Sequence, residues 1–291
     1  MKIFLTGSNG QLAKEIISVI KAGKCDFKNI SNNIKDAELI LFNSQELDIT
    51  DMDLVKNVIL QNEPDIIINC AAYTEVDLCE INEERALKVN SLGARNLAIA
   101  AEMVKAKLLH VSTDYIFSGN SKTPYREYDI ANPQTVYGKT KFLGEEYVKQ
   151  YCSRYFIIRT SWLYGINGNN FVYKIKSLAS KNKSIKVVND QIGNPTNAND
   201  LAYHILKIIE TNEFGIYHCT GAGECSWYDF ACEIVKLYKL DCEVIPCSSD
   251  EYKTRAKRPQ YSSLDNLMLR CTVGDEMRDW RKALKSFISR N

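Results

Sequence analysis

The sequence predicts an α/β fold with a doubly wound parallel sheet of the Rossmann type, and two observations carry that prediction. Over the first 160 residues, short apolar runs alternate with segments of helical periodicity. Near-continuous apolar strands separated by helices are typical of a parallel sheet covered on both faces. The first apolar run also leads directly into a glycine-containing turn, Thr-Gly-Ser-Asn-Gly-Gln-Leu-Ala, at residues 6–13. We therefore expect a ligand at the carboxyl ends of the strands.

The first half of the chain supplies most of the predicted elements. The helix over residues 11–24 follows from the spacing of its apolar side chains and ends near Gly23, and Thr50 or Asp51 caps the next helix. The strands are expected at residues 2–6, 38–42, 65–70, 107–112 and 155–159, and the helices at 11–24, 51–61, 82–105 and 137–150.

The second half is less regular. Its periodicity predicts helices at residues 171–182, 199–211 and 226–238 and strands at 186–188 and 243–245. We expect residues 1–160 to form a cofactor-binding domain. Residues 161–291 are expected to form mainly a smaller, intertwined substrate-binding lobe, with some segments returning to the Rossmann sheet.

Composition excludes several classes of protein. With 291 residues, the chain has room for one large α/β domain or for a cofactor domain with a smaller lobe. A net charge of +1 gives no support for nucleic-acid binding. No apolar run is long enough to span a membrane, and the N-terminal run is too short for a signal peptide, so we expect a cytoplasmic protein. The ten cysteines are scattered without a Cys-x-x-Cys pair, and no metal site is predicted.

The glycine turn is the first candidate binding motif. Gly7 permits a tight turn out of the strand, Gly10 lets the backbone approach a pyrophosphate, and the small Ala13 lets the helix pack near the sheet. The helix that begins near Gln11 aims its free N–H groups at the phosphates. After the second strand, residues 43–45 read Asn-Ser-Gln, with neither an acid for NAD nor an arginine for NADP. This disfavours strict use of NAD without establishing NADP.

Tyr137 and Lys141 are the candidate catalytic pair. Four residues apart on a helix, they share one face. An ammonium beside the phenol is expected to lower the pKa of the phenol, so that Tyr137 exchanges a proton with a carbonyl oxygen as hydride is transferred. The hydroxyl of Thr113 is expected nearby, at the end of a strand. Tyr203 and Lys207 have the same spacing, but they lie inside a helix of the irregular half, and we interpret them as a surface face.

Together, these residues resemble the dTDP-4-dehydrorhamnose reductases, a family of the extended short-chain dehydrogenase/reductases. The resemblance covers nearly the whole chain in order. The residues that carry it lie at 7–12, 47–51, 69–74, 112–117, 137–141, 159–165, 190–196, 226–228 and 258–259.

The resemblance implies a reaction and its participants. NADPH or NADH, with NADP favoured, would reduce the 4-keto group of dTDP-4-dehydro-6-deoxy-L-mannose to give dTDP-L-rhamnose for surface polysaccharide synthesis. The expected partner is this dTDP-sugar. The oligomeric state stays open, and a homodimer is compatible with the family.

The resemblance also assigns roles at the reacting end. Tyr137 would donate the proton, Lys141 would hold the nicotinamide ribose, and Thr113 would hydrogen-bond the reacting oxygen. Asp114 would contact the sugar, and Trp162 would lie against it as a flat wall. The residues leave structural alternatives open, since Trp162 also fits a core position and Asp114 also fits a brace within its loop.

For the cofactor, the resemblance implies three groups of contacts. Gly7, Gly10, Gln11 and Leu12 would meet the pyrophosphate. Asp48 and Ile49 would meet the adenine, although Asp48 also fits a cap before a helix. Ala71, Ala72 and Tyr73 would line the groove through their backbone.

Two further expectations concern charge. The basic cluster of Lys253, Arg255, Lys257 and Arg258 would supply one or two cations for the substrate's diphosphate, and Arg258 is our choice. Glu15 matches an acidic position that some family members use for Mg²⁺. A lone glutamate on a helix usually faces solvent, so no metal ligand is assigned.

Two alternatives remain. The first is another sugar-nucleotide reductase, epimerase or dehydratase, but a dehydratase would carry Thr-Asp-Glu where this chain has Thr113-Asp114-Tyr115. The second is a non-catalytic NADP-binding regulatory subunit. The presence of Thr113, Tyr137 and Lys141 argues against it, because a binding module has no need of a proton donor.

Overall fold

A computed structural model describes residues 1–252 and 254–290. Its central sheet has six strands in the order β10-β5-β4-β3-β1-β2, and every pairing within it is parallel. The winding reverses between β1 and β3, where doubly wound sheets bind their ligands. The predicted fold class is thereby confirmed. The strands are β1 (Lys2–Thr6), β2 (Glu38–Phe42), β3 (Ile66–Asn69), β4 (Lys107–Thr113), β5 (Tyr155–Thr160) and β10 (Gly215–His218).

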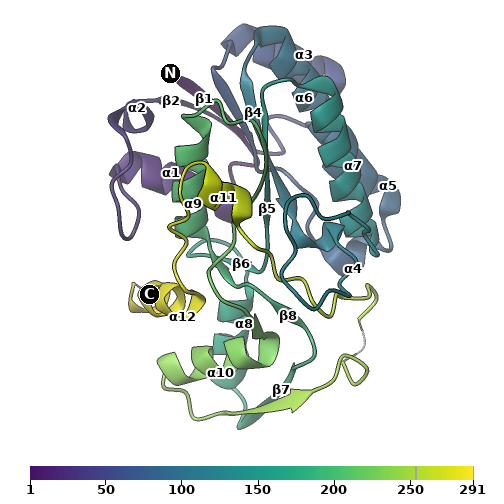
Figure 1. The fold of residues 1–291 in the computed structure, drawn as a ribbon, viewed down its shortest axis with the longest axis vertical. Helices are drawn as coiled ribbons and strands as arrows, with labels where there is room; N and C mark the ends of the chain where they lie inside the picture. The colour runs from purple at the N-terminus through teal and green to yellow at the C-terminus, as the bar shows by residue number, and fades with distance from the viewer. Residues whose placement is uncertain (253, 291) are drawn as a thin grey trace.

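Helices cover both faces of the sheet (Figure 1). Alternate strand residues point to opposite faces, so Ile3 and Leu5 pack in one apolar cluster and Phe4 in the other. On one face lie α1 (Gln11–Ala22) and α9 (Ala198–Ile209), which pack against each other. On the other lie α3 (Met52–Asn62), α6 (Gly93–Val104) and α7 (Val136–Tyr151).

A smaller lobe lies beyond the carboxyl ends of the strands (Figure 1). Its core contains Tyr164, Phe230 and Trp280, all nearly inaccessible to solvent. Its main elements are α8 (Phe171–Ala179), α10 (Trp227–Leu237), α12 (Trp280–Ser289) and the parallel pair β7 (Ser184–Val188) and β12 (Glu243–Cys247). The short pairs are β6 (Leu163–Tyr164) with β9 (Thr196–Asn197), and β8 (Ile192–Gly193) with β11 (Cys225–Ser226).

Three short helical segments are α2 (Asn32–Lys35), a 3-10 turn at Asp114–Ile116 and α11 (Leu267–Cys271). Among the described residues, no helix combines the length and apolarity that crossing a membrane requires.

The single helix expected at residues 82–105 is interrupted. After α4 (Val76–Cys79), the chain forms α5 (Glu83–Ala86), a π-helical segment (Leu87–Leu92) and then α6. The π segment contains Asn90, whose Oδ1 accepts from the N–H of Tyr73 at 2.8 Å and whose Nδ2 donates to the Tyr73 carbonyl at 3.1 Å. The irregular turn therefore holds the loop after β3, as such turns often do near functional sites.

Two side chains that we expected at the surface are buried. Tyr203 is 7% exposed and packs edge-to-face on Phe27. Glu15 is 3% exposed and accepts a hydrogen bond from Asn199 Nδ2 at 2.6 Å. Both corrections have one cause. Helix α9 of the second half covers α1, so the facing sides of both helices lie in the core.

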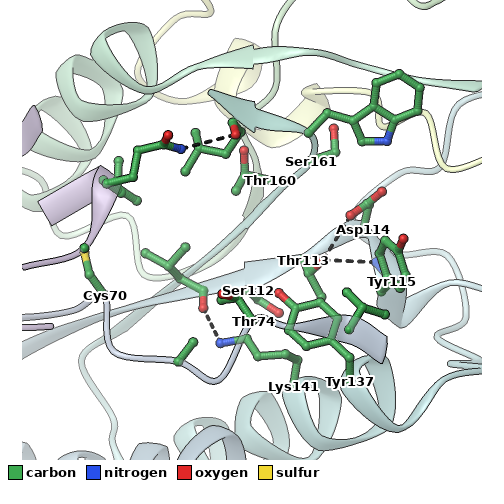
Figure 2. A pocket seen from close by; sticks show the side chains of 18 of the residues that line it. Cys70, Thr74, Ser112, Thr113, Asp114, Tyr115, Tyr137, Lys141, Thr160 and Ser161 are labelled. Atoms are coloured by element: carbon green, nitrogen blue, oxygen red, sulfur yellow. Dashed lines mark hydrogen bonds between the residues drawn. The ribbon is translucent and has the colours of Figure 1, made fainter. Parts of the chain in front are cut away.

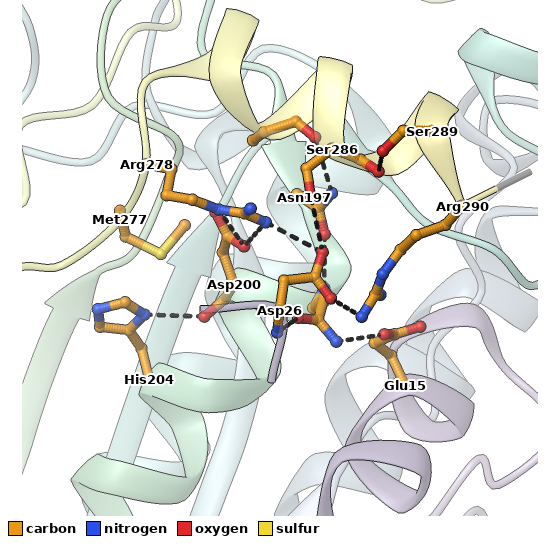
Figure 3. Close-up of polar contacts among 12 residues, drawn as sticks. Glu15, Asp26, Asn197, Asp200, His204, Met277, Arg278, Ser286, Ser289 and Arg290 are labelled. Carbon is orange, nitrogen blue, oxygen red and sulfur yellow. Dashed lines mark hydrogen bonds and ion pairs between the residues drawn. The ribbon is translucent and has the colours of Figure 1, made fainter. Parts of the chain in front are cut away.

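Beside Glu15, ion pairs to buried carboxylates tie the C-terminal segment to the segments around α1 and α9 (Figure 3). Arg278 pairs with Asp200 at 2.5 Å and with Asp26 at 3.3 Å, and Arg290 also pairs with Asp26. The side chains of Asp200 and Asp26 are almost inaccessible, and each needs a cation nearby to stay charged.

Candidate active site

Two adjoining cavities lie at the carboxyl ends of the strands. The larger, about 450 Å³, runs from the end of β4 to the second lobe (Figure 2). The smaller, about 300 Å³, extends towards β2. Gly10, Cys70 and Ala72 line both, so the two form one continuous groove over the sheet's switch point. An extended ligand with two lobes, such as a dinucleotide, matches this shape.

The glycine turn forms the floor between the two cavities. Gly7 has φ +66°, and a Cβ on it would lie 2.8 Å from the backbone nitrogen of Ala71, so only glycine fits. Gly10 precedes α1 without any side-chain cap, which leaves the first N–H groups of this 12-residue helix without an internal partner. Gln11 and Leu12 line the larger cavity. Uncapped N–H groups facing a cavity are suited to a pyrophosphate.

The smaller cavity contains the other predicted cofactor contacts, Asp48, Ile49, Ala71, Ala72 and Tyr73. Oδ1 of Asp48 accepts from the N–H of Thr50 at 2.9 Å, so Asp48 braces its own turn while lining the cavity. It does not cap the following helix, because the cap of α3 is Asp51, whose Oδ1 accepts from the N–H of Leu54 at 3.0 Å.

Tyr137 and Lys141 extend from α7 into the larger cavity, next to Thr113 (Figure 2). Thr135 caps the helix by accepting from the N–H of Gly138 at 3.0 Å. A Cβ on Gly138 would lie 2.2 Å from the carbonyl oxygen of Tyr115. This glycine therefore lets the first turn of α7 approach the loop after β4, which brings Tyr137 within hydrogen-bond reach of Thr113.

Burial dominates the electrostatics of this pair. It raises the pKa of Tyr137 above its usual value, and the hydrogen bond with Thr113 opposes the increase only in part. Burial lowers the pKa of Lys141 to about 8. The lowered phenol pKa that we expected from the sequence is therefore wrong for this structure. The lysine Nζ donates to the carbonyl of Val111 at 2.6 Å instead.

Asp114 follows Thr113 at the end of β4 and is 2% exposed. Its Oδ1 accepts from the hydroxyl of Thr113 at 2.9 Å, while its Oδ2 is buried without a hydrogen bond that meets normal geometry. Burial raises the pKa of Asp114 to about 6, and the hydroxyls of Ser262 and Thr113 oppose the increase. A buried acceptor at a cavity wall suits a sugar hydroxyl, which can donate to it.

Trp162 forms part of the opposite wall. It has φ +45°, an unusual value for a bulky residue, and its ring stacks on that of Trp227 with centroids 3.5 Å apart. Gly193 makes room for it, because a Cβ there would lie 2.6 Å from the indole. Trp162 thus belongs to the core on one side and to the cavity on the other.

Arg258 does not line either cavity of the groove. It donates to the hydroxyl of Tyr115 at 3.1 Å and pairs with Asp77 at 2.8 Å, and Tyr115 in turn lines the larger cavity. Of the other basic residues, Arg255 and Lys257 are exposed, and Lys253 lies outside the described residues.

The chain closely matches proteins of one family along its full length. Residues 1–291 match the RmlD substrate binding domain family. The chain is 37% identical to the dTDP-4-dehydrorhamnose reductase of Aggregatibacter actinomycetemcomitans, covering 98% of this chain and 97% of that protein. The crystal structure of a dTDP-4-dehydrorhamnose reductase from Clostridium acetobutylicum superposes with a TM-score of 0.94 at 45% identity, covering 99% of both chains. The chain belongs to the dTDP-4-dehydrorhamnose reductase family.

A third comparison concerns the cofactor. The Bacillus anthracis reductase, solved in complex with NADP, superposes with a TM-score of 0.93 at 38% identity, covering 100% of this chain and 99% of that one. The family resemblance expected from the sequence motifs is thereby confirmed. UDP-glucose 4-epimerase of Thermus thermophilus, at 15% identity, shares the fold alone.

In this reductase-family chain, Arg85 and Trp227 also line the groove, although the sequence assigned no role to either. Arg85, from α5, lines the smaller cavity and lies over the ring of Tyr73, 4.9 Å from its centroid. Trp227 lines the larger one from the second lobe. Arg85 lines the same cavity as Asn43 and Ser44, about forty residues earlier in the chain, and only the fold brings them together. Within residues 1–252 and 254–290, no group of three or more metal-ligating side chains comes together.

Proposed function

We propose that this protein is an NAD(P)H-dependent dTDP-4-dehydrorhamnose reductase. It reduces the 4-keto group of dTDP-4-dehydro-6-deoxy-L-mannose to give dTDP-L-rhamnose, for surface polysaccharide synthesis. One observation carries the proposal. The half-buried Tyr137 and the buried Lys141 and Thr113 meet in a cavity whose adjoining wall is a glycine turn before an uncapped helix, which suits a dinucleotide.

The chain's own residues supply everything except the hydride, which bound NAD(P)H provides. Tyr137 donates its phenolic proton to the C4 oxygen, so that the carbonyl gains one hydride and one proton and becomes an alcohol. Thr113, whose hydroxyl donates to Asp114 when no substrate is present, would turn that hydroxyl to the same oxygen and orient it. Lys141, as an ammonium, holds the ribose and stabilises the phenolate that Tyr137 becomes. Because Lys141 and Thr113 are buried, their electrostatic interactions are stronger than they would be in water.

The cofactor is expected to lie along the groove. Gly7, Gly10, Gln11 and Leu12 meet the pyrophosphate, Asp48 and Ile49 the adenosine, and Ala71, Ala72 and Tyr73 the groove wall. Arg85 places an exposed guanidinium in the adenosine cavity. Because a guanidinium pairs well with a phosphate, this residue favours NADPH over NADH.

The sugar nucleotide is expected to enter from the second lobe, which residues 161–291 mainly build. Asp114 would accept from a sugar hydroxyl, and Trp162 would cover the sugar ring. A further pocket of about 210 Å³ shares Tyr115 and Trp227 with the larger cavity. It combines cations suited to a diphosphate with an aromatic ring suited to a base, and these are Lys174, Lys186, Arg258 and Tyr252.

The regulatory-subunit alternative is disfavoured by Tyr137. The half-buried phenol of Tyr137 and the buried amine of Lys141 both have perturbed pKa values, and such pairs in a cavity are typical of sites that transfer protons. A homodimer and a cytoplasmic location remain predictions.

The direct test is turnover of the purified chain. With NADPH and dTDP-4-dehydro-6-deoxy-L-mannose, we expect loss of reduced nicotinamide and formation of dTDP-L-rhamnose, identified by NMR. UDP-4-keto sugars serve as the comparison substrates. Tight NADPH binding without oxidation of the cofactor would contradict the proposal and favour the regulatory alternative.

A further inference from the structure

A buried chain of polar side chains leads away from Lys141, behind the cavity. Lys141 Nζ lies 3.4 Å from His110 Nε2, and His110 Nδ1 lies 3.0 Å from Asn69 Nδ2. Asn69 Oδ1 in turn accepts from the hydroxyl of Thr6 at 2.8 Å. Each of these four side chains is 1% exposed. Because water does not reach these four side chains, every N–H group among them needs an acceptor on a neighbouring group.

The orientation of Asn69 fixes the tautomer of His110. The backbone N–H of Ala71 donates to Asn69 Oδ1 at 3.0 Å, and a backbone N–H can only donate. The amide nitrogen of Asn69 must therefore face His110 and donate to Nδ1. Since Nδ1 then carries the lone pair, the proton of the neutral imidazole is on Nε2. Burial, with the charge of Lys141, holds the pKa of His110 well below its usual range, so the ring stays neutral.

The N–H of His110 consequently points at the amine of Lys141. A neutral amine has a lone pair that accepts this hydrogen bond, whereas an ammonium has none. The contact with His110 therefore stabilises the neutral amine and opposes the ammonium.

The other groups that face Lys141 are Tyr137 and Glu145 from its own helix and Cys70 from the loop after β3. Glu145 favours the ammonium, but its carboxylate is already paired with Arg159 at 2.8 Å. Cys70 has a pKa raised to about 12 by burial, so its thiol stays neutral. His110 is thus the neighbour whose N–H acts directly on the amine.

We propose that His110 is a positioning residue which, held by Asn69 with its proton on Nε2, sets how readily Lys141 releases and regains a proton. This inference rests on the proposed function. After Tyr137 has given its proton to the substrate oxygen, the ammonium of Lys141 returns one to the phenolate and becomes an amine. His110 stabilises that amine until Lys141 takes a proton from water as the product leaves.

The tautomer is testable without any activity measurement. The chain has three histidines, and the other two serve as internal references. His204 Nδ1 lies 2.8 Å from the carbonyl oxygen of Asp200, and His218 Nδ1 lies 3.1 Å from that of Tyr125, so both carry their proton on Nδ1. Long-range ¹H–¹⁵N spectra of the whole protein should show two Nδ1–H rings and one Nε2–H ring, and only the latter should vanish in His110→Gln. A His110 ring protonated on Nδ1 would overturn the inference.

Asn69→Asp sharpens this test. The aspartate keeps an oxygen for the N–H of Ala71 and replaces the amide donor by a second acceptor. We expect Nδ1 of His110 to become protonated in this variant, while the His204 and His218 signals stay unchanged. An unchanged His110 pattern would show that Asn69 does not control the tautomer.

The effect on Lys141 is read from the pH profile of kcat. His110→Leu removes the N–H, so the pKa of Lys141 should rise and the high-pH limb should move upwards by about one pH unit, the effect of one hydrogen bond. His110→Gln keeps an N–H near the position of Nε2 and should leave the limb in place. A uniform loss of kcat at every pH in His110→Leu would mean a merely structural role. Absence of turnover in the wild-type protein would instead contradict the proposed function and leave the tautomer measurement valid.

Discussion

Arg258 and Asp77 form an ion pair of 2.8 Å that joins the C-terminal part of the chain to helix α4. The same guanidinium donates to the hydroxyl of Tyr115, which lines both the reaction cavity and the adjoining basic pocket. Arg258 therefore shapes the passage between the sugar and the diphosphate of the proposed substrate.

Replacing Arg258 should mainly weaken substrate binding. In Arg258→Met, we expect KM for the dTDP-sugar to rise at least about tenfold, equivalent to ~1.4 kcal/mol, because a charged hydrogen-bond donor to the diphosphate is lost. The Kd for NADPH should stay unchanged. Steady-state kinetics and cofactor titration measure the two effects. The matched control is Arg255→Met, which removes an exposed arginine three residues away and should behave as wild type. An equal KM in both variants would refute this role.

Arg85 should determine the choice between the two cofactors. In Arg85→Met, we expect KM for NADPH to rise about tenfold while KM for NADH changes little, because NADPH alone carries the extra phosphate. Lys88→Met is the control, since Lys88 lies nearby and pairs with Glu84 but does not line the cavity. If KM rose equally for NADPH and NADH in Arg85→Met, the guanidinium would not contact the extra phosphate of NADPH.

Asp114 should reduce the stability of the folded protein at neutral pH. Its pKa is raised from 3.8 to about 6 in the folded chain, so between these pH values the native state binds more protons than the unfolded one. Stability therefore falls as pH rises through this window, by a total of about 3 kcal/mol.

Asp114→Asn, which cannot ionise, should be the more stable protein above about pH 6 and should lose that advantage below about pH 4. Urea unfolding at several pH values measures the difference. Asp241→Asn is the control, because the side chain of Asp241 is 94% exposed. A gain in Asp114→Asn that is independent of pH would contradict the argument.

The sequence allowed the position of the turn and of the candidate catalytic pair to be predicted because both depend on local spacing. Gly7 and Gly10 follow a strand within a few residues, and Tyr137 and Lys141 share a helix face whatever the surroundings. The apolar run at residues 107–112 likewise predicted a strand end at Thr113, which is the last residue of β4.

The features that could not be predicted from the sequence depend on contacts between distant segments of the chain. Strand β10 joins the sheet only by pairing with β5, and Tyr203 is buried only because α9 covers α1. The sequence led us to expect a lowered pKa for Tyr137, and this expectation was wrong for the same reason. The spacing to Lys141 is visible in the sequence, whereas the burial that outweighs it is not.

The central claim is that Tyr137 donates the proton, and the most direct measurement compares Tyr137→Phe with Tyr203→Phe. Both variants remove one phenolic hydroxyl from a Tyr-x-x-x-Lys pair, but only Tyr137 lines the cavity. With NADPH and the dTDP-sugar, we predict that kcat falls by at least about a hundredfold in Tyr137→Phe and stays near the wild-type value in Tyr203→Phe. NADPH should still bind to both. Wild-type turnover by Tyr137→Phe would contradict the account.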